Sequence, residues 1–226
     1  MRIRLFAQLR ERAGASELSL ELPEGARVRD ALADARVASL ADGLPLVMAV
    51  NREYASDDAP LSPGDELALI PPVSGGASPA GAPAPAREPH VAIVDGPLSL
   101  DALLARVRDP RAGALVTFSG VTREVPSLDY EAYAEMALEQ MRAIVAEAVA
   151  RHGLCAAAAE HRVGVVPLSE ASVIVAVSAP HRPEAFAGGR EIIDRLKALA
   201  PIWKREVDEA GGAAWVPGTT PPAAGA

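Results

Sequence analysis

The chain has 226 residues, half of them hydrophobic but only 4% aromatic, and a formal net charge of −8. This length allows one large domain or two modest ones, and the acidic balance argues against a protein that binds nucleic acid through a broad basic face. The sequence has no membrane-length apolar stretch and no signal peptide, so we expect a cytoplasmic protein without a membrane or nucleic-acid partner. A single cysteine, Cys155, excludes an internal disulfide.

The first 76 residues have the pattern of a small sheet crossed by one helix. Apolar and polar residues alternate in the first two predicted strands, and Gly14 lies between them, where a turn belongs. The predicted strands are residues 3–7, 18–22, 46–50 and 66–70, and the predicted helix is residues 28–35. This arrangement fits a ubiquitin-like β-grasp domain.

A tether follows at residues 77–88, where proline and alanine dominate. Such a segment cannot form a core, and we expect a flexible, partly polyproline linker. Residues 217–226 have a similar composition and are predicted to be a disordered tail. The sequence therefore predicts a β-grasp domain at 1–76, the linker, a second domain at 89–216 and the tail.

The second domain alternates strands and helices, which predicts an α+β fold with its strands mostly in one sheet. Ser99 is a plausible N-cap of the first helix, Gly153 ends the second, and Pro183 opens the last, which should end before Pro201. The predicted helices are residues 100–107, 134–152 and 183–200, and the predicted strands are 114–121, 128–133, 156–163 and 171–179.

Lys197 and Lys204 are the two lysines of a chain that otherwise uses arginine. A spacing of seven corresponds to two helical turns, but Pro201 between them predicts a kink or a break. Lysine, unlike arginine, can lose its proton and act as a nucleophile or as a general acid–base. The pair therefore suggests a catalytic site, although two solvated surface lysines would give the same spacing.

Two further features suggest an anion site. His181 and Arg182 precede Pro183 at a helix N-terminus, where exposed N–H groups and the helix dipole favour negative charge. Arg123 follows a predicted strand and could add a contact from a loop. The alternative for His181 and Arg182 is a capped helix with a surface arginine, and the alternative for Arg123 is a solvated side chain.

The other candidates are weaker. We interpret His152, His161 and Arg162 as structural, and Cys155 as an inert buried thiol in an apolar stretch. The sequence contains no set of residues with metal-ligand spacing and no phosphate-binding glycine motif. Gly75-Gly76 could enter a narrow tunnel in extended form, or could simply begin the linker.

Together these stretches resemble the two subunits of molybdopterin synthase. Residues 1–76 are similar to the small sulfur-carrier subunit, which opens with Arg-Leu-Phe-Ala-Gln-Leu-Arg and closes on Pro-Pro-Val-Ser-Gly-Gly. Residues 89–216 are similar to the large catalytic subunit. The stretches that carry this second resemblance are Phe118-Ser-Gly with Arg123, Tyr130-Glu-Ala-Tyr133, His161-Arg-Val-Gly164, Ser178-Ala-Pro-His-Arg182, and Lys197 through Pro201-Ile-Trp-Lys-Arg-Glu206.

The resemblance implies a reaction and a set of roles. A separate activating enzyme would use ATP to adenylate the carrier's terminal glycine, which then becomes a thiocarboxylate and docks on the catalytic domain. Two sulfur transfers would convert cyclic pyranopterin monophosphate into molybdopterin, with no bound cofactor or metal. Lys197 and Lys204 would be catalytic, and the substrate would be held by Arg123, His181, Arg182, Arg205 and Glu206. A homodimer through the C-terminal domain is also implied.

The fusion of the two domains leaves three hypotheses open. A thiocarboxylate needs a free carboxyl group, but Gly76 is joined to Ala77, so we expect cleavage after Gly76. Alternatively, the chain stays intact and its β-grasp domain serves only for docking. A third possibility is a precursor of a ubiquitin-like protein tag, which explains the C-terminal domain least well.

Overall fold

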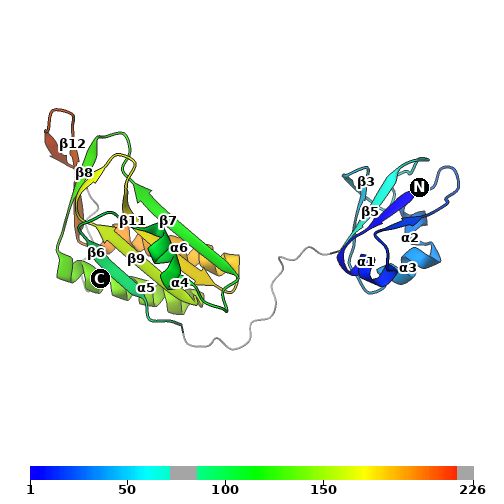
Figure 1. The fold of residues 1–226 in the computed structure, drawn as a ribbon, viewed down its shortest axis with the longest axis horizontal. Coiled ribbons are helices and arrows are strands. Elements are labelled where there is room, and N and C mark those ends of the chain that lie inside the picture. The colour runs from blue at the N-terminus through cyan, green and yellow to red at the C-terminus, as the bar shows by residue number, and fades with distance from the viewer. Residues whose placement is uncertain (72–85, 218–226) are drawn as a thin grey trace, which may run out of the picture. The chain divides into compact units, whose positions relative to one another are not determined.

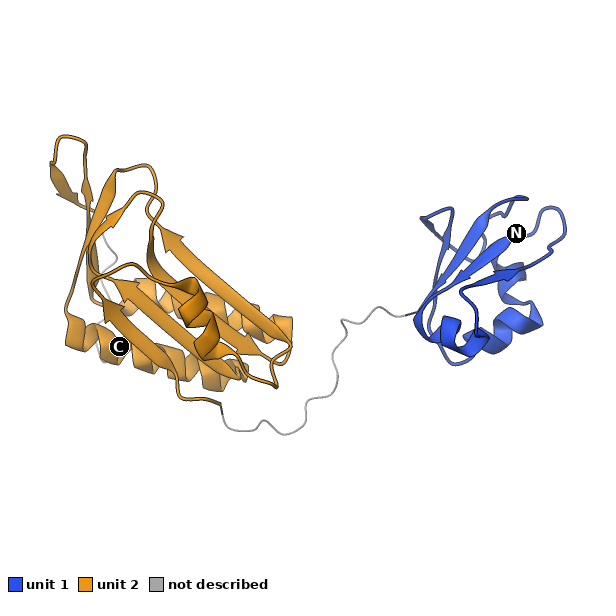
Figure 2. Ribbon diagram, in the orientation of Figure 1, with its two compact units in different colours: residues 1–78 blue, residues 79–226 orange. Residues whose placement is uncertain are grey.

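The computed structural model describes residues 1–71 and 86–217, and the chain divides into two compact units, residues 1–78 and 79–226 (Figure 2). Each unit has a hydrophobic core of its own. Gly75, Gly76, most of the expected linker and nearly all of the expected tail lie outside the described residues.

Unit 1 is built on one mixed five-stranded sheet with the strand order β2-β1-β5-β3-β4. The two central strands, β1 and β5, run parallel, and the other pairs are antiparallel. The elements are β1 (Arg2–Leu5), α1 (Ala7–Ala13), β2 (Glu17–Ser19), α2 (Val28–Leu32), α3 (Ala35–Ala41), β3 (Val47–Val50), β4 (Glu53–Ala55) and β5 (Glu66–Ile70). This is the β-grasp arrangement that the sequence predicts.

The alternation in β1 and β5 explains the core of unit 1. Ile3, Leu5, Leu67 and Leu69 point to the same side of the sheet, where they pack with Val28 of α2, and all five are buried. Full burial of such a side chain contributes about 1.5–3 kcal/mol. The pattern of alternate apolar residues therefore fixes which face of the sheet the helices cover.

Several predictions for unit 1 are wrong. The sequence predicts one helix at residues 28–35, but the structure has three helices, with α2 ending at Leu32 and α3 beginning at Ala35, and it adds the strand β4. The separation at Asp34, which is the N-cap of α3, interrupts the predicted helix.

The end of the first strand also differs from the prediction. Residue 7 was expected to continue the first strand, but that strand ends at Leu5 and α1 begins at Ala7. The helix buries Leu9 completely and ends at Gly14, whose φ of 63° suits glycine. A single apolar position in a seven-residue helix is too weak a periodicity to distinguish a helix from an extended strand.

Unit 2 contains eight strands and three helices within its described residues. They are β6 (His90–Val94), α4 (Leu100–Val107), β7 (Ala114–Val121), β8 (Ser127–Ala132), α5 (Ala134–His152), β9 (Ala156–Arg162), β10 (Gly164–Pro167), β11 (Ala171–Ala179), α6 (Arg182–Leu199), β12 (Ile202–Val207) and β13 (Ala213–Trp215). The predicted ends of α4 and α5 are confirmed: Ser99 accepts a hydrogen bond from Ala102 N–H, and Gly153 adopts the left-handed conformation that stops α5.

The strands of unit 2 form two sheets of four strands each, not mostly one sheet as expected. The first sheet has the order β6-β9-β11-β7, and the second has the order β10-β8-β12-β13. Strands β7 and β8 are consecutive in sequence but belong to different sheets. The same is true of β9 and β10. Sequence periodicity identifies strands but not the sheet that each joins, so this division depended on tertiary pairing.

The first sheet is covered by helices on both faces, with α5 and α6 on one side and α4 on the other (Figure 1). Strand β11 shows why: Val173, Val175 and Val177 pack against α5 and α6, whereas Ile174 and Ala176 pack against Leu103 and Val107 of α4. A strand that is buried on both faces has a nearly continuous run of apolar residues in its sequence. No helix in the described parts of the chain is long and apolar enough to cross a bilayer.

The chain passes directly from α6 into the second sheet. Helix α6 ends at Leu199, Pro201 cannot continue it, and β12 begins at Ile202. Strand β12 then pairs with β8 and β13. The break that Pro201 predicts is therefore confirmed, and it brings the end of a helix next to a strand of the second sheet.

Candidate functional site

An open cavity of about 530 Å³ lies in unit 2, between the second sheet, the C-terminal end of α6 and residues at the ends of β7, β9 and β11. Met141, Ile193, Leu196 and Ile202 give it an apolar lining. Its polar and charged lining residues are Arg123, Glu124, Tyr130, His161, Ser172, Lys197, Lys204 and Glu206. A concave site with an apolar base and a few converging polar groups is typical of small-molecule binding.

Both lysines of the chain line this cavity. Lys197 lies on the last turn of α6, and its Nζ is 5.4 Å from the centroid of the Phe118 ring, within the range of a cation–π contact. Lys204 lies on β12, opposite Tyr130 of β8 in the sheet register. The break at Pro201 therefore lets the two ammonium groups enter one site from different elements.

The alternation of side chains along β12 separates the residues that follow Lys204. Glu206 lines the cavity together with Lys204, but Arg205 is not among the lining residues. Its Nε and Nη2 donate to Asp129 Oδ2 at 2.9 and 2.6 Å, and its guanidinium lies 5.4 Å from the Trp215 ring centroid. Successive strand residues point to opposite faces, so Arg205 and Glu206 are turned in different directions. The expectation that Arg205 lines the same site as Glu206 does not match its position in one copy of unit 2.

Arg123 lines the cavity from the segment that follows β7. Its side chain is 81% exposed, and it pairs with the equally exposed Glu124 at 3.6 Å. Exposed ion pairs of this kind contribute little, so the Arg123 guanidinium can turn toward an anionic ligand at small cost. The sequence prediction that Arg123 accompanies the lysines agrees with its position.

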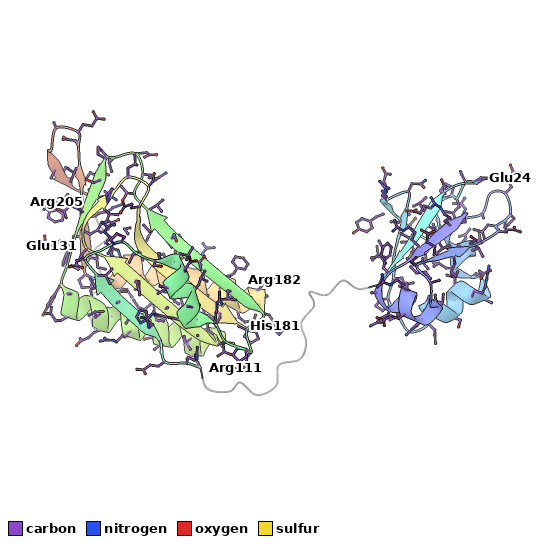
Figure 3. The ribbon with its side chains drawn as sticks, in the orientation of Figure 1. Glu24, Arg111, Glu131, His181, Arg182 and Arg205 are labelled. Carbon is purple, nitrogen blue, oxygen red and sulfur yellow. The ribbon has the colours of Figure 1, made fainter. Side chains whose placement is uncertain are left out.

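His181 and Arg182 do not line the cavity. They lie at the start of α6, and fifteen residues of this helix, at about 1.5 Å each, place Arg182 roughly 22 Å from Lys197. Figure 3 shows His181 and Arg182 at the opposite end of unit 2 from Arg205 and Glu131. One copy of unit 2 therefore does not bring all the predicted site residues together.

A hydrogen-bonded chain forms another wall of the cavity. The Tyr130 hydroxyl and Ser172 Oγ are 3.1 Å apart, and Ser172 Oγ donates to the Gly120 carbonyl at 3.2 Å. Burial raises the pKa of Tyr130, so its hydroxyl stays protonated and donates to Ser172. These two hydrogen bonds hold the Tyr130 ring in the cavity wall.

His161 packs against that ring, with the two ring centroids 5.1 Å apart and the planes at 67°. The sequence interpretation of His161 as structural did not anticipate that it lines the cavity. The signal that could have indicated it is the stretch His161-Arg-Val-Gly164, which lies among the stretches that carry the resemblance.

The arrangement combines cations for an anionic ligand with groups that transfer protons. Arg123, Lys197 and Lys204 can bind phosphate oxygens, and the lysines and Glu206 can donate or accept protons. Among the described residues, no group of three or more His, Cys, Asp or Glu side chains could hold a metal ion. The site therefore combines groups that can bind a small anionic molecule with groups that can transfer protons.

Two family models match the chain, one for each unit. The model described as "MoaE protein" matches residues 93–199, and the model described as "ThiS family" matches residues 3–76. The molybdopterin synthase catalytic subunit of Thermoplasma volcanium is 45% identical over 119 residues, which cover 50% of this chain and 87% of the relative. That of Pyricularia oryzae is 42% identical over 132 residues, covering 56% of this chain and 72% of the relative.

A solved structure agrees with these sequence relatives. The crystal structure of molybdopterin synthase from Staphylococcus aureus matches with a TM-score of 0.53 and 32% identity, covering 55% of this chain and 95% of that one. The fold and the site define an enzyme of molybdenum cofactor biosynthesis. The chain belongs to the family of molybdopterin synthase catalytic subunits, which are sulfurtransferases, and it carries a ThiS-family domain ahead of the catalytic one.

Proposed function

We propose that this chain makes molybdopterin from cyclic pyranopterin monophosphate, using sulfur carried as a thiocarboxylate on Gly76. The observation that carries the proposal is the cavity in which Lys197, Lys204 and Arg123 converge from three separate segments of unit 2. A substrate with a cyclic phosphate and a reaction with several proton transfers require this combination of charge and acid–base groups.

The sulfur chemistry requires a free carboxyl group on Gly76. We propose that the chain is cut between Gly76 and Ala77, after which an ATP-dependent activating enzyme adenylates Gly76 and exchanges one oxygen for sulfur. The thiocarboxylate sulfur then bonds to a substrate carbon as an oxygen substituent leaves that carbon with a proton, and water breaks the acyl–sulfur bond and leaves the Gly76 carboxylate. Two such rounds supply both sulfur atoms of the dithiolene.

The lysines have distinct positions in this scheme. Lys204 lies beside Tyr130 and Glu206 on the sheet side, and Lys197 lies beside Phe118 on the helix side. Either amine can hold the substrate's developing negative charge or pass a proton to a leaving oxygen. Arg123 holds the phosphate from the loop.

His181 and Arg182 enter this scheme only through a second copy of the chain. The roughly 22 Å that separate Arg182 from Lys197 along α6 exclude a shared ligand within one copy. We propose a homodimer through unit 2 in which these two residues approach the cavity of the partner. In a two-fold assembly the same patch contributes to both sites.

The decisive experiment compares the intact chain with the chain cut after Gly76. Each is incubated with the activating enzyme, ATP, a sulfide source and cyclic pyranopterin monophosphate, and molybdopterin is measured. We expect product from the cut chain alone. Product from the intact chain only when a separate thiocarboxylated carrier is added would favour the docking-module alternative, and no product in any mixture would refute the proposed function.

A further inference from the structure

His161 is held in one orientation and one tautomer within the cavity wall. Its Nδ1 lies 2.8 Å from the Arg162 carbonyl oxygen. A carbonyl oxygen can only accept, so Nδ1 must carry the hydrogen. The Tyr130 ring packs edge-on against the imidazole, and Tyr130 is itself held by Ser172. The orientation of the ring is therefore set by contacts from β8, β9 and β11.

The ring is also uncharged. Burial, with a further contribution from the positive charge of Lys197, lowers the pKa of His161 to about 4. Nε2 is therefore unprotonated near neutral pH, and its lone pair can accept a hydrogen bond. Such a weak base cannot deprotonate a lysine ammonium effectively, which argues against a role as general base.

The lone pair on Nε2 is accessible at a residue that lines the cavity. Among the described residues none forms a hydrogen bond to this atom, and Nε2 is not one of the buried polar atoms that lack a partner. His161 lines the same cavity as Lys197. The wall thus presents an uncharged acceptor within electrostatic range of an ammonium donor.

The charged side chains of the cavity do not supply an uncharged acceptor. Arg123, Lys197 and Lys204 are cationic donors, and Glu124 and Glu206 are carboxylates. The cations hold an anionic group but do not distinguish one end of an uncharged ring system from another. An uncharged acceptor at a fixed position can accept a hydrogen bond from an N–H or O–H group of the ligand and so fix its orientation.

We propose that His161 Nε2 accepts a hydrogen bond from an N–H or O–H group on the ring system of the bound substrate, and so orients that ring beside Lys197. This inference rests on the proposed function, since the ligand is the substrate of that reaction. Loss of the acceptor leaves a buried donor of the ligand without a partner, which should weaken binding about 10- to 100-fold.

The test uses the full uncut chain, which carries no thiocarboxylate and therefore does not consume bound substrate, and cyclic pyranopterin monophosphate as the probe. Dissociation constants are measured by calorimetry for this parent chain and for three substitutions. His161→Leu removes the acceptor, and we expect the 10- to 100-fold loss. His161→Gln places an amide oxygen near the position of Nε2 and should bind within about threefold of the parent. His90→Gln, on the neighbouring strand β6 and outside the cavity lining, should bind like the parent.

Nitrogen NMR of the chain without a His161 substitution provides a second readout, which reports directly on the imidazole nitrogens. The chain has four histidines, so the His161 signal is identified by its loss in His161→Gln. We expect a neutral ring with the hydrogen on Nδ1 between about pH 6 and 8, and a shift of the Nε2 resonance when substrate is added.

Two results would overturn the inference alone: an Nε2 resonance that does not move at saturating substrate, or His161→Leu binding within about twofold of the parent. If the chain without a His161 substitution did not bind the substrate at all, the proposed function and this inference would both fall.

Discussion

Arg182 and Lys197 belong to the same helix, α6, but lie at its two ends, roughly 22 Å apart. Only Lys197 lines the cavity. If both residues serve the same reaction, as the resemblance to molybdopterin synthase implies, each cavity must receive its Arg182 from another copy of the chain. This relationship can be tested directly by mixing inactive variants.

Co-expression of Arg182→Ala and Lys204→Ala chains should restore activity that neither variant has alone. In a mixed dimer one cavity receives both defects and the other receives none. Random pairing should therefore recover about a quarter of the wild-type activity. Molybdopterin formation by the co-purified chains is the measurement.

A matched control is a mixture of Lys197→Ala and Lys204→Ala chains. These lysines line the same cavity of one chain, so every cavity in a mixed dimer retains one defect and no recovery is expected. Equal activity in the two mixtures, or a monomer in solution, would contradict the shared site.

Lys204→Ala should reduce turnover by at least about 100-fold, because it removes an ammonium group from the reaction site. The thermal unfolding of unit 2 should change little. Arg205→Gln is a suitable control, since the neighbouring residue pairs with Asp129 outside the cavity lining. It should retain activity within a few-fold. Near-normal turnover by Lys204→Ala would refute the assignment of this lysine.

Intact-mass spectrometry of the chain purified from its native cells should find a fragment that ends at Gly76. Part of this fragment should carry the mass change of one oxygen-to-sulfur exchange, because the thiocarboxylate forms on the freed carboxyl group. Deletion of Gly76 should abolish the shifted species and leave the stability of unit 2 unchanged. A full-length mass alone would remove Gly76 from the reaction.

The two cores should respond separately to cavity-creating substitutions. Leu67 is fully buried in unit 1 and Ile192 is fully buried in unit 2. Replacement of either by alanine should lower the free energy of unfolding of its own unit by about 2–5 kcal/mol. Hydrogen exchange resolved by segment should locate each loss. Equal destabilisation of both units by one substitution would show that the units unfold together.

Glu191 should make unit 2 sensitive to acid. A hydrogen bond from His152, together with Arg195 and Arg151, lowers the pKa of Glu191 despite its partial burial. Since the folded-state pKa is below the unfolded one, the stabilisation is fully present above the unfolded value of about 4.3 and is lost as the pH falls through the folded pKa.

Glu191→Gln should therefore destabilise unit 2 by about 1 kcal/mol near neutral pH. The difference from wild type should disappear in acid. Denaturant titrations across the acidic range measure this difference, with Glu139→Gln on the exposed face of α5 as the control. A difference that stays constant as the pH falls would exclude the ionised carboxylate as its cause.

Local sequence signals were sufficient for several features of this protein. Gly153 stops α5 because glycine readily adopts the left-handed conformation, and Pro201 ends α6 because it cannot continue the hydrogen bonding of the helix. Lys197 and Lys204 stand out because the chain uses arginine everywhere else. Each of these signals acts over one or two turns of chain, so each can be read without knowledge of distant residues.

The composition of the site depended on contacts between distant segments. Strands β7 and β8 enter different sheets, Arg205 pairs with Asp129, and His161 reaches the cavity that Lys197 lines. Strand periodicity places Arg205 and Lys204 on opposite faces, but it does not specify which partner covers each face. The sequence by itself determined the two domains, the principal elements and the lysine pair. Only the tertiary structure decided which side chains share the cavity, since that depends on strand pairing and on the length of α6.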